Sequence, residues 1–181
     1  MTHFELFGLP PSFPIDLAAL EKQYRALSLQ CHPDRVARDA DARERRLALE
    51  RTTALNDAFQ VLKDPVRRAF YLLKLAGVDL DREDLGTQKD MPLEFLEEVI
   101  DRREALSEAK AAKDLTRVRA LAEAVAAEQD KALALGVESL AALQGAPGDA
   151  ASLKNASHQL GRVRYFTRFL EEVEQIEEGA L

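Results

Sequence analysis

Apolar residues in this 181-residue chain recur at alternating steps of three and four, and this spacing runs through nearly every long segment. It places apolar side chains on one face of an α-helix, whereas a half-buried strand needs strict alternation of apolar and polar residues. No segment shows that alternation. The absence of Trp and the low aromatic content of 6% also favour helix over strand. The pattern therefore predicts an all-α fold.

Proline and glycine divide the first part of the chain into helices. Asp16 and the pair Asp64-Pro65 are typical helix starts, and Gly77 is a typical helix end. Between them lie two long amphipathic helices and a shorter one, which predict a helical hairpin with short flanking helices. The predicted apolar stripes are Leu17, Leu20, Tyr24, Leu27 and Cys31, then Ala48, Thr52, Leu55, Phe59 and Leu62, then Ala69, Leu72, Leu73 and Ala76.

The periodicity disappears over residues 78–91 and then returns in three further helices. One starts at Pro92, one at Asp114 and one after the break at Gly145-Ala146-Pro147-Gly148. Gly136, within the second of them, is a candidate bend. Three such helices joined by short turns predict an antiparallel bundle. We therefore expect a domain over 1–76, a linker over 77–91 and a three-helix domain over 92–181. The stripe of the last helix is Leu153, Ala156, Leu160, Val163, Thr167, Leu170 and Val173.

The charge differs between the two parts of the chain. Residues 1–80 hold 12 Lys and Arg against 11 Asp and Glu, whereas residues 81–181 hold 13 against 21. Two domains with different partners are therefore expected, and the overall charge of -7 argues against nucleic-acid binding through a broad basic face. One Cys and three scattered His predict no metal site and no cofactor. No apolar stretch is long enough to span a bilayer and no secretory signal is visible, so no membrane partner and a cytoplasmic or organelle-matrix location are expected.

The string Gln30-Cys31-His32-Pro33-Asp34-Arg35 lies between the first two long helices. Pro33 has a fixed φ and stiffens the turn, so His32 and Asp34 would be presented outward. Asp34 could accept a bidentate pair from an arginine of a partner, while Lys22 and Arg25 offer positive charge to an acidic surface. The tripeptide taken alone favours a plain loop in which His32 and Asp34 cap helix ends.

The context of this tripeptide resembles a J-domain, the module that activates DnaK-type heat-shock ATPases. The segment Leu55–Pro65, with Arg67-Arg68-Ala69 after it, is similar to the second signature of that family. The J-domain together with an acidic helical domain resembles the HscB family, the co-chaperones of iron–sulfur cluster assembly. This resemblance implies a DnaK-type partner, HscA, and the cluster scaffold IscU as client. The chaperone contacts that it implies are His32, Pro33, Asp34, Lys22, Arg25 and Arg35.

Two features of the second domain point to a contact surface. Tyr165 falls opposite the apolar stripe of its own helix, and the helix from Pro92 carries an apolar arc of about 160°, wider than the usual stripe of about 100°. One edge of that arc could pack in the bundle while Leu93, Leu96 and Ile100 remain for a partner. A more deeply buried helix would explain the arc equally well. The resemblance places scaffold binding at Leu96, Glu97, Ile100, Asp101, Glu104 and Tyr165.

The sequence therefore predicts a co-chaperone rather than an enzyme. No phosphate-binding GxxxxGK[ST] loop is present, so ATP hydrolysis is expected to belong to the partner. Two alternatives remain. One is a J-domain protein with a different client, and the other is a helical adaptor in which the His-Pro-Asp string is accidental.

Overall fold

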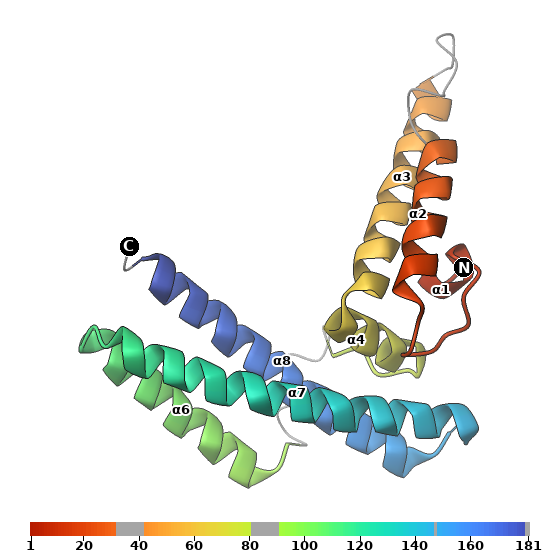
Figure 1. Ribbon diagram of the computed structural model, residues 1–181. Coiled ribbons are helices and arrows are strands. Elements are labelled where there is room, and N and C mark those ends of the chain that lie inside the picture. Colours follow the sequence, from red (N-terminus) through yellow and green to blue (C-terminus); the bar gives the residue numbers. More distant parts are fainter. Residues whose placement is uncertain (32–41, 81–90, 147, 180–181) are drawn as a thin grey trace. The chain divides into compact units, whose positions relative to one another are not determined.

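The computed structural model describes residues 1–31, 42–80, 91–146 and 148–179, and in these ranges every regular element is a helix (Figure 1). The predicted all-α fold is confirmed. The residues separate into two compact units, Met1–Leu72 and Leu73–Leu181. Among the described helices, none is long and apolar enough to cross a membrane.

The first unit is built on a helical hairpin. It contains α1 (His3–Leu6), α2 (Leu17–Cys31), α3 (Ala42–Lys63) and most of α4 (Pro65–Leu75), and α2 lies alongside α3 (Figure 1). The two predicted helix starts are present. An Asp16 carboxylate oxygen accepts from the N–H of Ala18 at 2.9 Å, and an Asp64 oxygen accepts from the N–H of Arg67 at 2.8 Å. These bonds satisfy N–H groups that a helix leaves unpaired in its first turn.

The core of the hairpin follows the predicted stripes, except at two helix ends. Leu20 and Leu62 are fully buried, and the ring of Tyr24 stacks on Phe59 with centroids 4.1 Å apart. Leu17, however, is 47% exposed, and Ala76 is exposed as well. Leu17 is the first residue of α2 and Ala76 follows the last residue of α4. A residue at a helix end has helical neighbours on one side only, so packing covers less of its side chain.

Arg68 joins the end of α3 to α4. It is 7% exposed, and its Nη1 donates to the carbonyl of Leu62 at 2.5 Å while its guanidinium lies 4.7 Å from the ring centroid of Phe13. Burial lowers the pKa of Arg68 from its usual value, and the neighbouring Asp64 carboxylate opposes that shift. The side chain thus supplies a charged donor to a carbonyl that the helix end leaves unpaired.

Arg68→Ala is expected to lower the free energy of unfolding of the first unit by about 2–3 kcal/mol, because a buried charged hydrogen bond and a packed stem are both lost. Urea denaturation followed by circular dichroism measures this. Arg67→Ala is the matched control, since Arg67 is exposed and should change stability by less than about 0.5 kcal/mol. Equal stability of the two variants would contradict the structural role of Arg68.

The second unit holds α6 (Leu93–Ala111), α7 (Leu115–Gly145) and α8 (Ala150–Glu178). Asp114 caps α7 by accepting from the N–H of Arg117 at 3.0 Å, and α7 runs along α8 (Figure 1). Gly136, a candidate bend in the sequence, lies within the continuous helix α7 and is buried. A Cβ at Gly136 would lie 3.0 Å from Leu160 Cδ2. The glycine therefore permits a close approach of α7 and α8.

The buried face of α8 is wider than its predicted stripe. Phe166 and Phe169 are 0% and 2% exposed although neither lies on the stripe, while Thr167 is only partly buried. The reason is that α8 packs against two helices. Its stripe meets α7, and Phe166 meets Phe95 of α6 edge-on with centroids 5.9 Å apart.

Candidate functional site

The structure describes two of the six residues predicted to contact a chaperone. Lys22 and Arg25 are both exposed on α2. Arg25 Nη2 lies 3.8 Å from Glu21, and the same carboxylate lies 3.5 Å from Lys63 Nζ of α3. Exposed ion pairs of this length contribute little stability, so Arg25 and Lys63 can leave Glu21 for a partner's carboxylate at little cost in free energy. The other four predicted residues, His32, Pro33, Asp34 and Arg35, lie outside the described residues.

Contacts of Tyr24 with α3 set the orientation of α2. The Tyr24 hydroxyl donates to the side-chain oxygen of Asn56 at 2.9 Å, in addition to the stacking of its ring on Phe59. These contacts fix one face of α2 against α3. Lys22 and Arg25 consequently remain on the face that points to solvent.

The wide apolar arc of α6 has one buried edge and one exposed edge, as the helical angles of its residues predict. Phe95 and Leu106 are 4% and 2% exposed, whereas Leu93 and Ile100 are 68% and 64% exposed. Leu96 is partly exposed. A more deeply buried helix is thereby excluded. The exposed apolar residues are accompanied by three exposed carboxylates, those of Glu97, Asp101 and Glu104.

Tyr165 joins this face from α8. Its hydroxyl donates to the Val99 carbonyl at 3.3 Å, and its ring meets Phe95 edge-on with centroids 5.8 Å apart. Tyr165 is partly buried rather than turned fully away from the bundle. Burial raises the pKa of the Tyr165 phenol from its usual value, and the nearby Arg103 opposes that shift. The contacts place Tyr165 beside α6, and we define Leu96, Glu97, Ile100, Asp101, Glu104 and Tyr165 as the α6 patch.

A group of charged residues behind the α6 patch was not predicted as a site. Arg102 Nη2 lies 2.7 Å from both carboxylate oxygens of Glu128 on α7 and 3.4 Å from Glu98. The Arg162 guanidinium lies 4.7 Å from the ring centroid of Phe95. The two arginines thus tie α6 to its neighbours. No sequence spacing could reveal this, since the partners stand 26 residues apart on different helices.

No group of three or more His, Cys, Asp and Glu that could hold a metal ion occurs in the part of the chain that the structure describes. The candidate site consists of two surfaces, the basic side of α2 and the α6 patch. Both offer exposed charged or apolar side chains, which suit the binding of other proteins.

Comparison with known proteins gives matches over both units. A family model described as the DnaJ domain matches residues 2–71, and one described as the HSCB C-terminal oligomerisation domain matches residues 91–174. A co-chaperone protein HscB homolog of Ralstonia nicotianae is 48% identical over 114 residues, which cover 63% of this chain and 62% of that protein. A co-chaperone protein HscB homolog of Vibrio cholerae is 37% identical over 181 residues, covering 100% of this chain and 99% of that protein. The structure of the chaperone HscB from Vibrio cholerae is similar over 100% of both chains, with a TM-score of 0.77 and 34% identity.

Proposed function

Because this chain belongs to the HscB family of co-chaperones, we propose that it stimulates the ATPase of a DnaK-type chaperone, HscA, and delivers the scaffold protein IscU to it during iron–sulfur cluster assembly. The observation that carries the proposal is the match to HscB homologs over the full length of the chain, because it includes both the DnaJ domain and the C-terminal domain of the HscB family. We place this activity in the cytoplasm or an organelle matrix. ATP hydrolysis takes place on the partner.

The chaperone side of the proposal rests on α2 and on residues 32–35, which follow it in the sequence. Lys22 and Arg25 are exposed on one face, next to the chain position of the His32-Pro33-Asp34 string. An acidic surface on the ATPase would meet two exposed cations, and among the described residues Arg25 has only its long pair with Glu21 at 3.8 Å. Such contacts act mainly on the rate of association and therefore weaken with salt.

The client side rests on the α6 patch. Ile100 is 64% exposed, and Leu96 and Tyr165 are partly exposed. Partly exposed apolar side chains next to an aromatic anchor are the usual source of interface energy, with polar neighbours at the rim. Glu97, Asp101 and Glu104 supply that rim and favour a client surface that carries basic residues.

Two measurements test the proposal. Purified full-length protein should increase ATP turnover by HscA, and IscU should co-purify with it. A chain that stimulates HscA and does not bind IscU would be a J-domain protein with a different client. A chain that does neither would be a helical adaptor.

The fragment 1–76 is expected to fold without the rest of the chain and to stimulate the basal ATPase without IscU. We expect this because the core residues Leu20 and Leu62 and the Tyr24–Phe59 stack lie entirely within the first compact unit, Met1–Leu72. Circular dichroism and an ATPase assay measure both properties. A fragment without helical signal would contradict the proposed domain boundary, and a folded but inactive fragment would contradict the proposed role of the first unit.

A further inference from the structure

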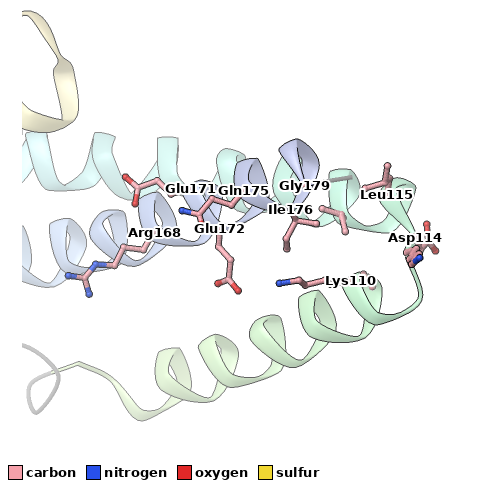
Figure 2. A pocket seen from close by; sticks show the side chains of 12 residues that line it. Lys110, Asp114, Leu115, Arg168, Glu171, Glu172, Gln175, Ile176 and Gly179 are labelled. Carbon is pink, nitrogen blue, oxygen red and sulfur yellow. The ribbon is translucent and has the colours of Figure 1, made fainter. Parts of the chain in front are cut away.

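The seam between α6 and α8 opens into a groove beyond the α6 patch. The groove has a volume of about 1010 Å³, and Leu115 and Val118 of α7 also line it. Figure 2 shows Glu172 and Ile176 projecting from α8 and Lys110 projecting from α6 into the space between the two helices. Val118 is buried, whereas Leu115 and Ile176 are only partly buried. The groove therefore offers accessible apolar surface in addition to its charged walls.

The two walls of the groove differ in their balance of charge. Lys110 and Lys113, from the end of α6 and the turn after it, outnumber Asp114, whereas Glu171 and Glu172 outnumber Arg168 on α8. The side chains of the two lysines and the two glutamates are exposed, and within the described residues none of these four forms an ion pair. Opposite charges thus line a groove without neutralising one another. An occupant that carries acidic groups toward α6 and basic groups toward α8 would be complementary to both walls.

Lys113 holds a backbone conformation that lysine seldom adopts. It stands just after α6 with a φ of 53°, in the left-handed region, and its N–H donates to the Lys110 carbonyl at 3.0 Å. Glycine is the usual residue at this position of a helix end, because a Cβ is disfavoured there. Strained backbone of this kind gathers at binding sites. Here it carries a lysine side chain that lines the groove.

The groove continues the α6 patch along the same seam. On α8, Arg168 at one end of the groove follows Tyr165 by one helical turn, and Glu172 and Ile176 follow at helical spacing. On α6, Lys110 lies seven residues after Arg103 and eleven after Val99, which accepts the Tyr165 hydroxyl. These steps of seven and eleven keep the residues on one face of a helix. A client bound at the α6 patch can therefore extend into the groove without changing direction.

We infer that the groove is a second contact site for the client, one that takes an amphipathic segment with an aliphatic anchor, acidic residues toward Lys110 and Lys113, and basic residues toward Glu171 and Glu172. This inference rests on the proposed function, because it assigns the groove to the scaffold protein. The α6 patch holds one part of the client, and the groove selects the segment next to it by its charge pattern.

Charge reversal in the full-length protein tests the inference. Calorimetric titration with IscU should show that Lys110→Glu with Lys113→Glu weakens binding at least about fivefold, and that Glu171→Lys with Glu172→Lys weakens it similarly. The matched control is Lys131→Glu with Lys154→Glu, which changes the net charge equally at exposed residues outside the groove. This control should bind IscU as the unchanged protein does.

A second pair of variants separates binding from stability. Lys113→Gly removes the side chain and relieves the strained backbone, whereas Lys113→Ala removes the side chain and keeps a Cβ at a φ of 53°. Both should weaken IscU binding by at least about twofold. Lys113→Gly should raise the melting temperature and Lys113→Ala should leave it near that of the unmodified protein, so the loss of affinity in either variant cannot come from a loss of fold.

Three results would overturn the inference. The first is unchanged IscU affinity in the groove variants while the unmodified protein binds IscU, since the proposed function would then stand without the groove. The second is an equal loss of affinity in the Lys131 and Lys154 control, which would show a general charge effect. The third is a dimer of the unmodified protein that Lys110→Glu with Lys113→Glu converts to monomer, which would assign the groove to a second copy. Failure of the unmodified protein to bind IscU would instead reject the proposed function, and the groove assignment with it.

Discussion

His32→Gln is expected to reduce stimulation of the HscA ATPase to the basal rate while leaving the helical content and the melting temperature unchanged. The hairpin core is formed by Leu20, Leu55, Leu62 and the Tyr24–Phe59 stack, all of which lie outside residues 32–41. The sequence predicts that Pro33 stiffens the turn around His32, and a residue in such a turn can serve recognition without supporting the fold. ATP turnover and thermal circular dichroism are the two measurements.

The control for this variant is His158→Gln, the same replacement on α8 of the second unit. It should leave the basal stimulation of the ATPase intact. Loss of folding in His32→Gln would show that the loop belongs to the core. Full stimulation by a folded His32→Gln would contradict the role assigned to the His-Pro-Asp string.

Combined replacement of Leu96, Ile100 and Tyr165 by alanine should weaken IscU binding by at least about tenfold, which corresponds to about 1.4 kcal/mol. These residues are the apolar part of the α6 patch, and exposed anchors of this kind often contribute more than about 1 kcal/mol each. Stimulation of the ATPase without IscU should not change, because the proposed function assigns it to the first unit. Calorimetry of binding, with a thermal melt of the same variant, measures both effects.

The melt distinguishes loss of contact from loss of fold. Tyr165→Ala alone removes the ring contacts with Phe95 and Phe166 and should account for most of any fall in melting temperature. Leu135→Ala is the matched control for an exposed aliphatic side chain, since Leu135 is 47% exposed on α7. It should affect neither binding nor folding. Unchanged affinity in the folded triple variant would place the client surface elsewhere.

The sequence allowed the helices to be predicted because their starts and ends are local. A carboxylate at Asp16, Asp64 or Asp114 captures N–H groups two or three residues ahead, and Gly77 adopts a φ of 101° just after α4. Such signals depend on neighbouring residues alone. The division of the α6 arc was also predictable in outline, because helical angles decide which side chains share a face.

What the sequence did not reveal depends on contacts between helices. Phe166 and Phe169 are buried because α8 meets α6 as well as α7, and a single stripe describes only one such contact. The groove has the same origin, since its walls belong to α6 and α8 and α7 contributes Leu115 and Val118. Arg102 and Glu128 could be paired only once the helices were placed. Periodicity thus defines faces, and only the packed structure shows which faces meet.

The close approach at Gly136 has a consequence for how the second unit assembles. Helices α7 and α8 have 31 and 29 residues, and α7 is rich in alanine and leucine, so several alignments of the two helices along each other would bury similar apolar area. Leu160 lies where a Cβ at residue 136 would come within 3.0 Å, so this site on α7 accepts the leucine because it lacks a side chain. A shift by one turn would bring Leu160 against a bulkier residue, Ala132 or Leu140, and would leave an empty space at Gly136. The missing Cβ of Gly136 therefore selects one alignment of α7 and α8 over the alignments that are shifted by a helical turn.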